Sequence, residues 1–207
     1  MPELPPEYAC NNCRTAAAFR GACERMPLGC PTLTHPEITK DVSGYLEADA
    51  QELMQVANQS PFDEAGKKRT RVDELIFYAH ERGYERIGIA FCVSMTKESQ
   101  ELVRQLEAAN LTAYSVCCRA GAMDYDTIGL PKAHPERFAS ICNPIAQARL
   151  LNEAGVQLAV NMGLCIGHDI LLQEHCDAPV TTLVVKDRAL DHHPIEALRP
   201  RAGPLDV

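Results

Sequence analysis

Tryptophan is absent from this 207-residue sequence, and aromatic residues make up only 5% of it. Proteins that bind single-stranded nucleic acid stack bases on aromatic side chains, and those that bind a duplex carry an excess of Lys and Arg. This sequence has 20 Lys and Arg against 28 Asp and Glu, which gives a formal net charge of −8. We therefore expect no nucleic-acid partner.

Long apolar runs are also missing, because none approaches the roughly 20 residues that a membrane-spanning helix needs. The first residues, 1–7, have neither the basic start nor the apolar middle of a secretory signal peptide. There is no glycine-rich phosphate loop, no serine nucleophile elbow and no paired His-x3-His zinc motif. We therefore expect a cytosolic protein with no membrane partner, and neither nucleotide hydrolysis nor serine-type hydrolysis.

Ten cysteines stand out against an otherwise ordinary globular composition. Disulfides do not persist in the reducing cytosol, so a cysteine-rich cytosolic protein more often binds metal or performs thiol chemistry. Four of the cysteines fall within residues 1–36, a segment that prolines interrupt and that has few large apolar residues. This segment is predicted to be an irregular N-terminal domain that a metal or a cross-link must order.

The spacing of these four cysteines is typical of a metal site. Cys10-x2-Cys13 can place two sulfurs on one metal or cluster, and Cys23 and Cys30 complete four ligands. Pro31 follows the last of them, as a proline follows the last ligand of bacterial ferredoxin runs. Four sulfurs suit either a structural zinc or a 4Fe–4S cluster, and the spacing does not separate these two.

Residues 37–207 are predicted to form an α/β domain. Apolar positions at helical spacing indicate two helices, over 39–58 and 66–82. Strands are predicted at 86–93, 112–118, 156–164 and 180–186, with helices at 97–110, from Asn143 onward and at 167–176, and a long polar connection at 119–141. Strands separated by helices of this length predict a mainly parallel sheet with helices on both faces, preceded by the two helices and the cysteine-rich segment.

Cysteines occur where the predicted strands end. Cys92 ends the first strand, Cys117 and Cys118 end the second, Cys165 follows the third, and Cys142 closes the long connection just before a helix. In open α/β sheets, ligands bind outside the carboxyl ends of the strands. The N-terminus of a helix also favours thiolate over thiol, which applies to Cys142 and Cys165. We therefore predict a second metal or cofactor site, formed by Cys92, Cys142, Cys165 and one or both of Cys117 and Cys118.

Two polar residues are candidates for catalysis beside this predicted site. His168, three residues after Cys165, falls in the first turn of a predicted helix, where its imidazole could bind a metal, donate a proton to a substrate or cap the helix. Lys186 follows the last strand within a short charged run, which could bind an anionic substrate or simply form surface. His192 and His193 are expected to be exposed in a polar tail.

Several longer strings resemble one protein family. They are IGIAFCV (87–93), SVCC (115–118), CNPIAQARLLN (142–152), GLCIGHD (163–169) and TTLVVKDRALDHHP (181–194). These strings are similar to the prokaryotic family called domain of unknown function 1847, and the resemblance spans nearly the whole chain, including the N-terminal cysteines. It implies metal binding through the cysteines, and it implies no established reaction.

Many thiolates with few imidazoles near them suit iron–sulfur chemistry better than catalytic zinc, which typically includes His. We therefore expect a metal-binding protein with an iron–sulfur cofactor of the 4Fe–4S kind. It would serve electron transfer or cluster-based chemistry, with a redox partner protein or a small-molecule substrate. The alternative is a zinc protein, with structural zinc or the task of a non-catalytic sensor, carrier or interaction module. Thiol–disulfide chemistry at the adjacent pair Cys117 and Cys118 ranks last, because such a pair is geometrically awkward for a disulfide.

Overall fold

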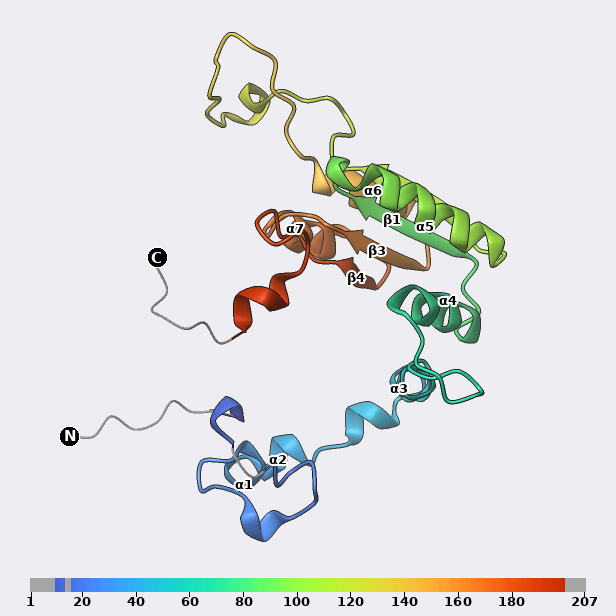
Figure 1. Ribbon diagram of the computed structural model, residues 1–207, viewed down its shortest axis with the longest axis vertical. Coiled ribbons are helices and arrows are strands. Elements are labelled where there is room, and N and C mark those ends of the chain that lie inside the picture. Colours follow the sequence, from blue (N-terminus) through green and yellow to red (C-terminus); the bar gives the residue numbers. More distant parts are fainter. Residues whose placement is uncertain (1–9, 14–15, 200–207) are drawn as a thin grey trace, which may run out of the picture. The chain divides into compact units, whose positions relative to one another are not determined.

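The computed structural model describes residues 10–13 and 16–199, and the chain divides into two compact units, Met1–Gln55 and Val56–Val207 (Figure 1). Before residue 48, the described residues of the first unit form short helical elements. They are 3₁₀-helices at Cys10–Asn12, Cys23–Arg25 and Ser43–Leu46, and the helices α1 (Pro31–Thr34) and α2 (Pro36–Thr39). Helix α3 (Ala48–Gln59) runs from the first unit into the second. The sequence-predicted boundary after residue 36 falls inside the first unit.

The helix predicted over 39–58 begins only at Ala48, so its first part is wrong. Val42 and Leu46, two apolar positions behind that prediction, are 58% and 68% exposed. Because these side chains bury little apolar surface, packing does not offset the cost of nucleating a helix over 39–47.

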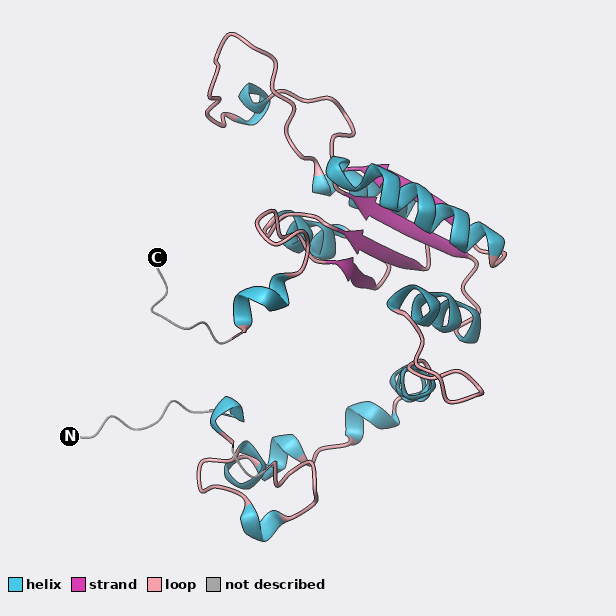
Figure 2. Cartoon of the chain, in the orientation of Figure 1, coloured by secondary structure: helices cyan, strands magenta, loops and turns pink. Residues whose placement is uncertain are grey.

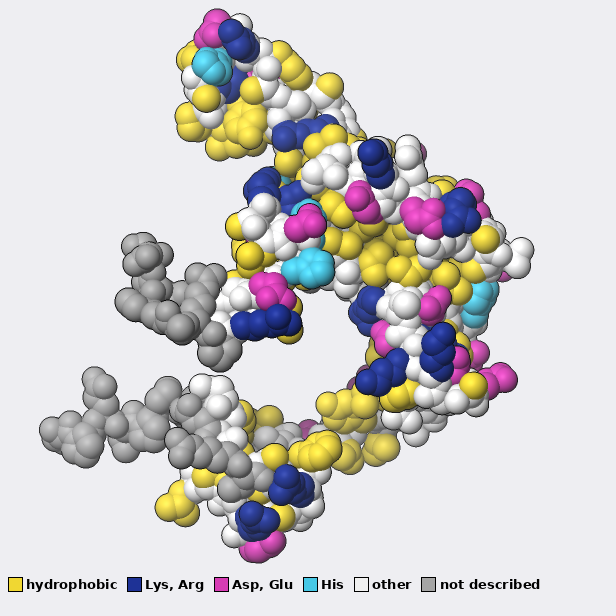
Figure 3. All heavy atoms as spheres, in the orientation of Figure 1, with side chains coloured by type: hydrophobic (Ala, Val, Ile, Leu, Met, Phe, Trp, Pro, Cys, Tyr) yellow, Lys and Arg dark blue, Asp and Glu magenta, His cyan; other side chains and the backbone are white. Residues whose placement is uncertain are grey.

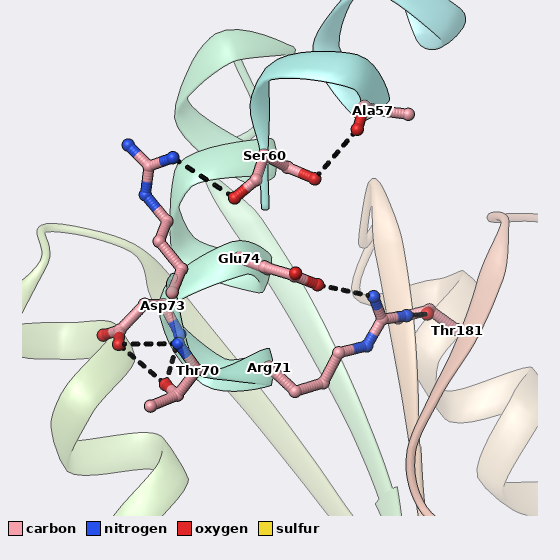
Figure 4. Close-up of polar contacts among 8 residues, drawn as sticks. Ala57, Ser60, Thr70, Arg71, Asp73, Glu74 and Thr181 are labelled. Atoms are coloured by element: carbon pink, nitrogen blue, oxygen red, sulfur yellow. Dashed lines mark hydrogen bonds and ion pairs between the residues drawn. The ribbon is translucent and has the colours of Figure 1, made fainter. Parts of the chain in front are cut away.

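Helix α4 (Arg71–Glu81) begins where its N-terminal amides find partners. Thr70 accepts a hydrogen bond from the amide of Asp73, and the Asp73 carboxylate accepts one from the amide of Thr70, which is a capping box (Figure 4). The helix ends before Gly83, whose φ of 64° is the left-handed conformation that glycine adopts at low cost. Arg71 bonds Glu74 within the helix and reaches Thr181 at 3.0 Å, which ties α4 to the sheet (Figure 4).

Four parallel strands form one sheet, in the order β2-β1-β3-β4 (Figure 2). They are β1 (Arg86–Phe91), β2 (Thr112–Cys117), β3 (Leu158–Met162) and β4 (Val180–Val184). The connecting helices are α5 (Thr96–Ala108), α6 (Pro144–Glu153) and α7 (His168–His175), with further 3₁₀-helices at Val93–Met95, Tyr125–Ile128 and Pro194–Leu198. The predicted α/β fold with a mainly parallel sheet is therefore confirmed. None of the described helices is long and apolar enough to cross a membrane.

Alternating side chains of the strands bury two apolar cores, one on each face of the sheet. Ile87, Ile89 and Phe91 pack with side chains of α4 and α5, whereas Ala90 packs with side chains of α6 and α7. Figure 1 shows α5 in front of the sheet and α6 and α7 behind it. The predicted placement of helices on both faces is confirmed.

The strand order fixes where a ligand crevice lies. The chain passes from β1 to its neighbour β2 on one side, returns across β1 to β3 on the other side, and then continues outward to β4. The direction of winding therefore reverses between β1 and β3. Ligands of open α/β sheets bind at such a point, beyond the carboxyl ends of the strands.

Residues 119–141, between β2 and α6, form an arm that extends away from the sheet (Figure 1). A bridge between Asp124 and Ser140 joins the two sides of its base, and Lys132 forms ion pairs there with Asp124 and Asp126. The arm exposes the apolar side chains of Ile128, Leu130 and Phe138, and Figure 3 shows apolar side chains on its surface.

Candidate functional site

Three cysteines from separate segments meet at the carboxyl edge of the sheet, on the α6 and α7 side. Cys92 and Cys118 are buried in the apolar core beneath these helices, and Cys142 packs against the same core. Backbone bonds extend the strand ladder to hold them there. The Cys92 amide donates to Met162 at 3.0 Å, the Cys118 amide donates to Phe91 at 2.8 Å, and the Asn143 amide donates to Cys118 at 2.8 Å.

Helix α6 begins directly after Cys142 because its first residues are good caps. The Asn143 side chain accepts a hydrogen bond from the amide of Ala146, and Pro144 occupies the first helical position. The Asn143 amide group also donates to the carbonyl of Ala120, in the first part of the arm, at 3.3 Å. Both ends of the arm are thereby held at the edge of the sheet, which brings Cys142 back toward Cys118.

Cys118 lies at the centre of this group, which we call the thiol trio (Cys92, Cys118 and Cys142). Burial raises the pKa of the Cys118 thiol to about 12. A hydrogen bond from the Val93 amide, 3.3 Å from the sulfur, opposes this rise, and the nearby Cys142 and Cys92 thiols add to it. Cys118 is therefore close enough to both other thiols for each to affect its ionisation.

At Cys92, the causes that lower the thiol pKa outweigh those that raise it. Burial raises its pKa, but hydrogen bonds from Ser94 and Lys186 outweigh this effect and lower the pKa to about 7. The Lys186 ammonium donates to the Cys92 sulfur at 3.1 Å and to the Ser94 hydroxyl at 2.7 Å, and that hydroxyl donates to the same sulfur at 3.3 Å. Cys92 is thus the thiol of the trio that ionises near neutral pH.

The other two predicted site cysteines, Cys117 and Cys165, are not among the thiols that shift the pKa of Cys118. Cys117 pairs in register with Phe91, whose side chain belongs to the core under α4 and α5. Successive side chains of a strand point to opposite faces, so the Cys117 side chain leaves the strand on the face opposite Cys118, although Cys117, at the strand end, also packs against the core beneath α6 and α7. Cys165 is half-buried in the loop between β3 and α7, and its sulfur accepts a hydrogen bond from Arg188 at 3.2 Å.

His168 is the first residue of α7, as predicted, and it lies near two cations. Burial lowers the pKa of its imidazole, and the charges of Arg119 and Arg188 lower it further, while Asp169 raises it. The imidazole is therefore neutral at pH 7, when it can both donate and accept a hydrogen bond.

The sequence interpretation missed three residues of this edge: Ser94, Arg119 and His192. His192 is half-buried, so the expectation that it is exposed is wrong, whereas His193 is exposed as expected. The Nδ1 atom of His192 lies 3.2 Å from the carbonyl of Val185 and 3.3 Å from the amide of Asp187, so it braces the loop that carries Lys186. No motif marks these residues, although Ser94 and Arg119 each lie within two positions of a predicted site cysteine.

The side chain of Gln147, in α6, links the ends of β1 and β2 by hydrogen bonds. Its Nε2 atom donates to the carbonyl of Val116 at 2.7 Å and to that of Phe91 at 3.3 Å, so one fully buried amide joins β1 and β2 just before their cysteines. Its Oε1 atom is buried without a hydrogen-bond partner among the described residues.

Within residues 10–13 and 16–199, no group of three or more His, Cys, Asp or Glu side chains is arranged to hold a metal ion. The donor chemistry of the thiol trio nevertheless fits a thiophilic metal, because all three groups are sulfurs and one of them ionises near pH 7.

A family described as "Protein of unknown function (DUF1847)" matches residues 30–183. The chain belongs to this family. It is also similar to the "Uncharacterized protein MJ0455" of Methanocaldococcus jannaschii, with 38% identity over 169 residues, which are 80% of this chain and 87% of the relative. The part of the chain that matches DUF1847 contains the whole thiol trio. It begins at Cys30 and ends before Lys186, so it is narrower than the resemblance across nearly the whole chain that the sequence strings indicated.

The other three N-terminal cysteines thus precede the DUF1847 match. Cys10, Cys13 and Cys23 are exposed and Cys30 is half-buried. The amide of Cys13 donates to the carbonyl of Cys10 at 3.1 Å, which closes a turn over the Cys-x2-Cys pair. No disulfide joins any of the ten cysteines, all of which lie in the described part of the chain.

Proposed function

We propose that this DUF1847 protein binds metal through cysteine thiolates, with one site at the carboxyl edge of the sheet and another in the N-terminal segment. The observation that carries the proposal is the position of Cys118, which is close to both Cys92 and Cys142. Three segments far apart in the sequence each bring a sulfur to the place where open α/β sheets bind ligands. Thiols that served only as apolar packing would not need to share that edge.

An iron–sulfur cluster is the metal group that the donor set favours, and zinc is the alternative. The trio supplies sulfur ligands only, and iron–sulfur clusters are held mainly by cysteine thiolates. The Lys186 ammonium on the Cys92 sulfur is a hydrogen bond of the kind that tunes such sites. Because the three sulfurs do not yet surround a common point, the proposal includes their movement toward the bound metal.

The N-terminal site of the proposal comprises Cys10, Cys13, Cys23 and Cys30. With iron–sulfur clusters at both sites, the protein would transfer electrons to a redox partner or act on a small molecule at the crevice. With zinc, the N-terminal site would be structural. The cytosol is the compartment that suits either case, because its thiols stay reduced.

The test is the metal content of protein purified without oxygen, with iron, acid-labile sulfide and zinc assayed on one sample. We expect about four irons and matching sulfide for each 4Fe–4S cluster. About one zinc per four-cysteine site, without iron, would support the zinc alternative. Protein that holds neither metal, even after reconstitution with iron and sulfide or with zinc, contradicts the proposal.

Two neighbouring cysteines provide a matched pair of variants. Cys118→Ser should remove the metal of the crevice, whereas Cys117→Ser, one position away but on the other face of the sheet, should leave it in place. Cys10→Ser should remove only the N-terminal metal. If Cys118→Ser and Cys117→Ser lose the same amount of metal, the thiol trio is not the site.

A further inference from the structure

Three cations at the carboxyl edge of the sheet have no acidic partner among the residues that the structure describes. Arg119 follows β2, and Lys186 and Arg188 follow β4. Within the described part of the chain, none of the three forms an ion pair with a carboxylate. This is unusual in a chain with a net charge of −8, where acidic residues outnumber basic ones.

Two carboxylates of this edge, Asp187 and Asp169, accept hydrogen bonds from backbone amides. Asp187 accepts hydrogen bonds from the amides of Ala189 and Leu190, at 3.0 and 2.9 Å, and so shapes the turn after Lys186. Asp169 accepts one from the amide of Ile170 at 2.8 Å. The positive charge of the three cations is therefore not cancelled by direct pairing.

These cations surround the candidate site from two sides. Lys186 donates to Cys92, and Arg188 donates to Cys165. His168 lies within electrostatic range of both arginines, although these come from different segments of the chain. Figure 3 shows Lys, Arg and His side chains over this end of the sheet, with Asp or Glu side chains among them.

We propose that Arg119, Lys186 and Arg188 bind the oxyanion group, a carboxylate or a phosphate, of a small-molecule substrate beside the thiols of the crevice. This inference deepens the proposed function by naming the substrate class, and it rests on that function for what happens to the bound molecule. The binding of the anion itself needs no metal.

The donors of the three side chains suit this task. A guanidinium has five N–H donors in a planar fork, and an ammonium has three. Arg119 uses one nitrogen on the carbonyl of Ser140, and Arg188 uses one on Cys165, so each has N–H groups left for a ligand. Guanidinium forks bind carboxylate and phosphate groups through paired, charge-assisted hydrogen bonds.

The experiment measures thermal unfolding of the protein as purified, in inorganic phosphate, in acetate and in chloride at equal ionic strength. A ligand that binds only the folded state raises the melting temperature, and a site filled well above its dissociation constant should raise it by about 3 °C or more relative to chloride. Phosphate also stabilises folded proteins without binding a site, because it is excluded from their surface. The assignment therefore uses only the part of each rise that is lost when Arg119 or Arg188 is replaced. A larger such part in phosphate assigns a phosphate-bearing substrate, and a larger one in acetate assigns a carboxylate. Equal melting temperatures in all three salts overturn the inference.

Variants locate the effect. Arg188→Gln and Arg119→Gln should each remove the part of the rise in phosphate or acetate that comes from a bound anion, and leave only the general effect of the salt. Arg149→Gln removes the same charge from an exposed position of α6 and should retain the rise. If Arg149→Gln loses the rise as completely as the other two variants, the anion acts through overall charge, and the inference fails.

The same samples are assayed for metal, so the two proposals can fail separately. A rise in phosphate or acetate in a protein without metal supports the anion site and contradicts the thiolate metal site. Bound metal without such a rise supports the thiolate metal site and contradicts the anion site. Arg188→Gln that keeps its metal but loses the rise supports both proposals.

Discussion

The Lys186 ammonium lies 3.1 Å from the Cys92 sulfur, although 94 positions separate the two residues. Each follows the end of a strand, Cys92 after β1 and Lys186 after β4, and β3 lies between those two strands. The long side chain of Lys186 reaches across the end of β3 to the sulfur. A cation at this distance favours the thiolate form of Cys92, whose pKa is lowered to about 7.

Replacement of this lysine should slow the reaction of Cys92 with an alkylating reagent. The pKa of Cys92, about 7, makes about half of it thiolate at pH 7. Lys186→Gln should raise that pKa, and Ser94 should limit the rise. We expect the rate of alkylation by iodoacetamide at pH 7 to fall at least about threefold in protein depleted of metal, because the thiolate is the reacting form. Mass spectrometry of the Cys92 peptide gives the rate.

The exposed Lys97 of α5 provides the control for this change. Lys97→Gln should leave the rate at Cys92 unaltered. Near pH 10, where Cys92 is ionised in both proteins, Lys186→Gln and the unaltered protein should react equally fast. A rate that is lower by the same factor at every pH would mean that Lys186 affects access to the thiol and not its ionisation.

Gln147→Glu should destabilise the fold, by an amount that depends on pH. A carboxylate in place of the buried Nε2 group would face the carbonyls of Phe91 and Val116, so the pKa of the new side chain should rise on folding. A carboxyl group whose pKa is raised in the folded state costs little stability below its unfolded pKa, about 4.3, and progressively more above it. We expect a loss of about 3 kcal/mol at pH 8, and a smaller loss at pH 5, in urea unfolding.

Gln173→Glu makes the same change at an exposed position of α7. Its unfolding free energy should differ little from that of the unaltered protein at either pH. Equal stability of Gln147→Glu at pH 5 and pH 8 would show that position 147 is open to water, contrary to its complete burial here.

Gly88→Ala should destabilise the contact between β1 and α6. A Cβ atom at Gly88 would lie 3.0 Å from both terminal carbons of Leu151 and 3.1 Å from a methyl group of Val156. Leu151 is fully buried, so it has little room to move. We expect a loss of about 1–3 kcal/mol in the unfolding free energy, as in other overpacked cores. Gly44→Ala, where a Cβ atom meets nothing within 4 Å, should not produce this loss.

Asp124→Asn should loosen the arm without unfolding the sheet. Hydrogen bonds from the amide of Asp126, from Lys132 and from the amide of Ala139 lower the pKa of the Asp124 carboxyl to about 2. The folded-state pKa lies below the ordinary value of 3.8, so the contribution to stability is complete above that value and is lost as the pH falls toward 2.

Amide hydrogen exchange measures this effect directly. Protection of the Ala139 amide, which donates to Asp124 at 2.9 Å, should decrease in Asp124→Asn at neutral pH and in the unaltered protein as the pH falls from 4 to 2. Glu136→Gln changes an exposed carboxylate in the same arm and should leave that protection intact. If the Ala139 amide is equally protected in Asp124→Asn, the Asp124 carboxylate does not keep the arm in place, and contacts of Ser140 and its neighbours do so instead.

Much of the fold could be predicted because its signals are local. The apolar runs that became β1 to β4 and the cap at Asn143 and Pro144 are readable within a few residues. The helix predicted over 39–47 does not form, and the reason is that Val42 and Leu46 have helical spacing and yet stay exposed. Spacing predicts which face a helix would bury, but not whether an apolar surface is there to meet it.

For the candidate site, only the edge of the sheet at which the cysteines lie could be predicted from the sequence. Because parallel strands end at one edge, the sequence alone predicts that Cys92, Cys142, Cys165 and one or both of Cys117 and Cys118 lie in the same region. The separation of Cys117 from Cys118 depends on register, since a shift of one residue exchanges the faces of every side chain on a strand. The partners Ser94, Arg119 and His192 could not be found from motifs, because loops set their positions.

The sequence by itself determined the alternation of strands and helices, the parallel sheet and the edge at which the cysteines gather, because each follows from local periodicity and from the geometry of parallel strands. Only the tertiary structure decided the rest: which thiols are neighbours, that Lys186 reaches Cys92 and Arg188 reaches Cys165, and that three cations there lack carboxylates. Those relationships join residues up to 94 positions apart. They depend on the order of the strands and the paths of the loops, which no local pattern of residues specifies.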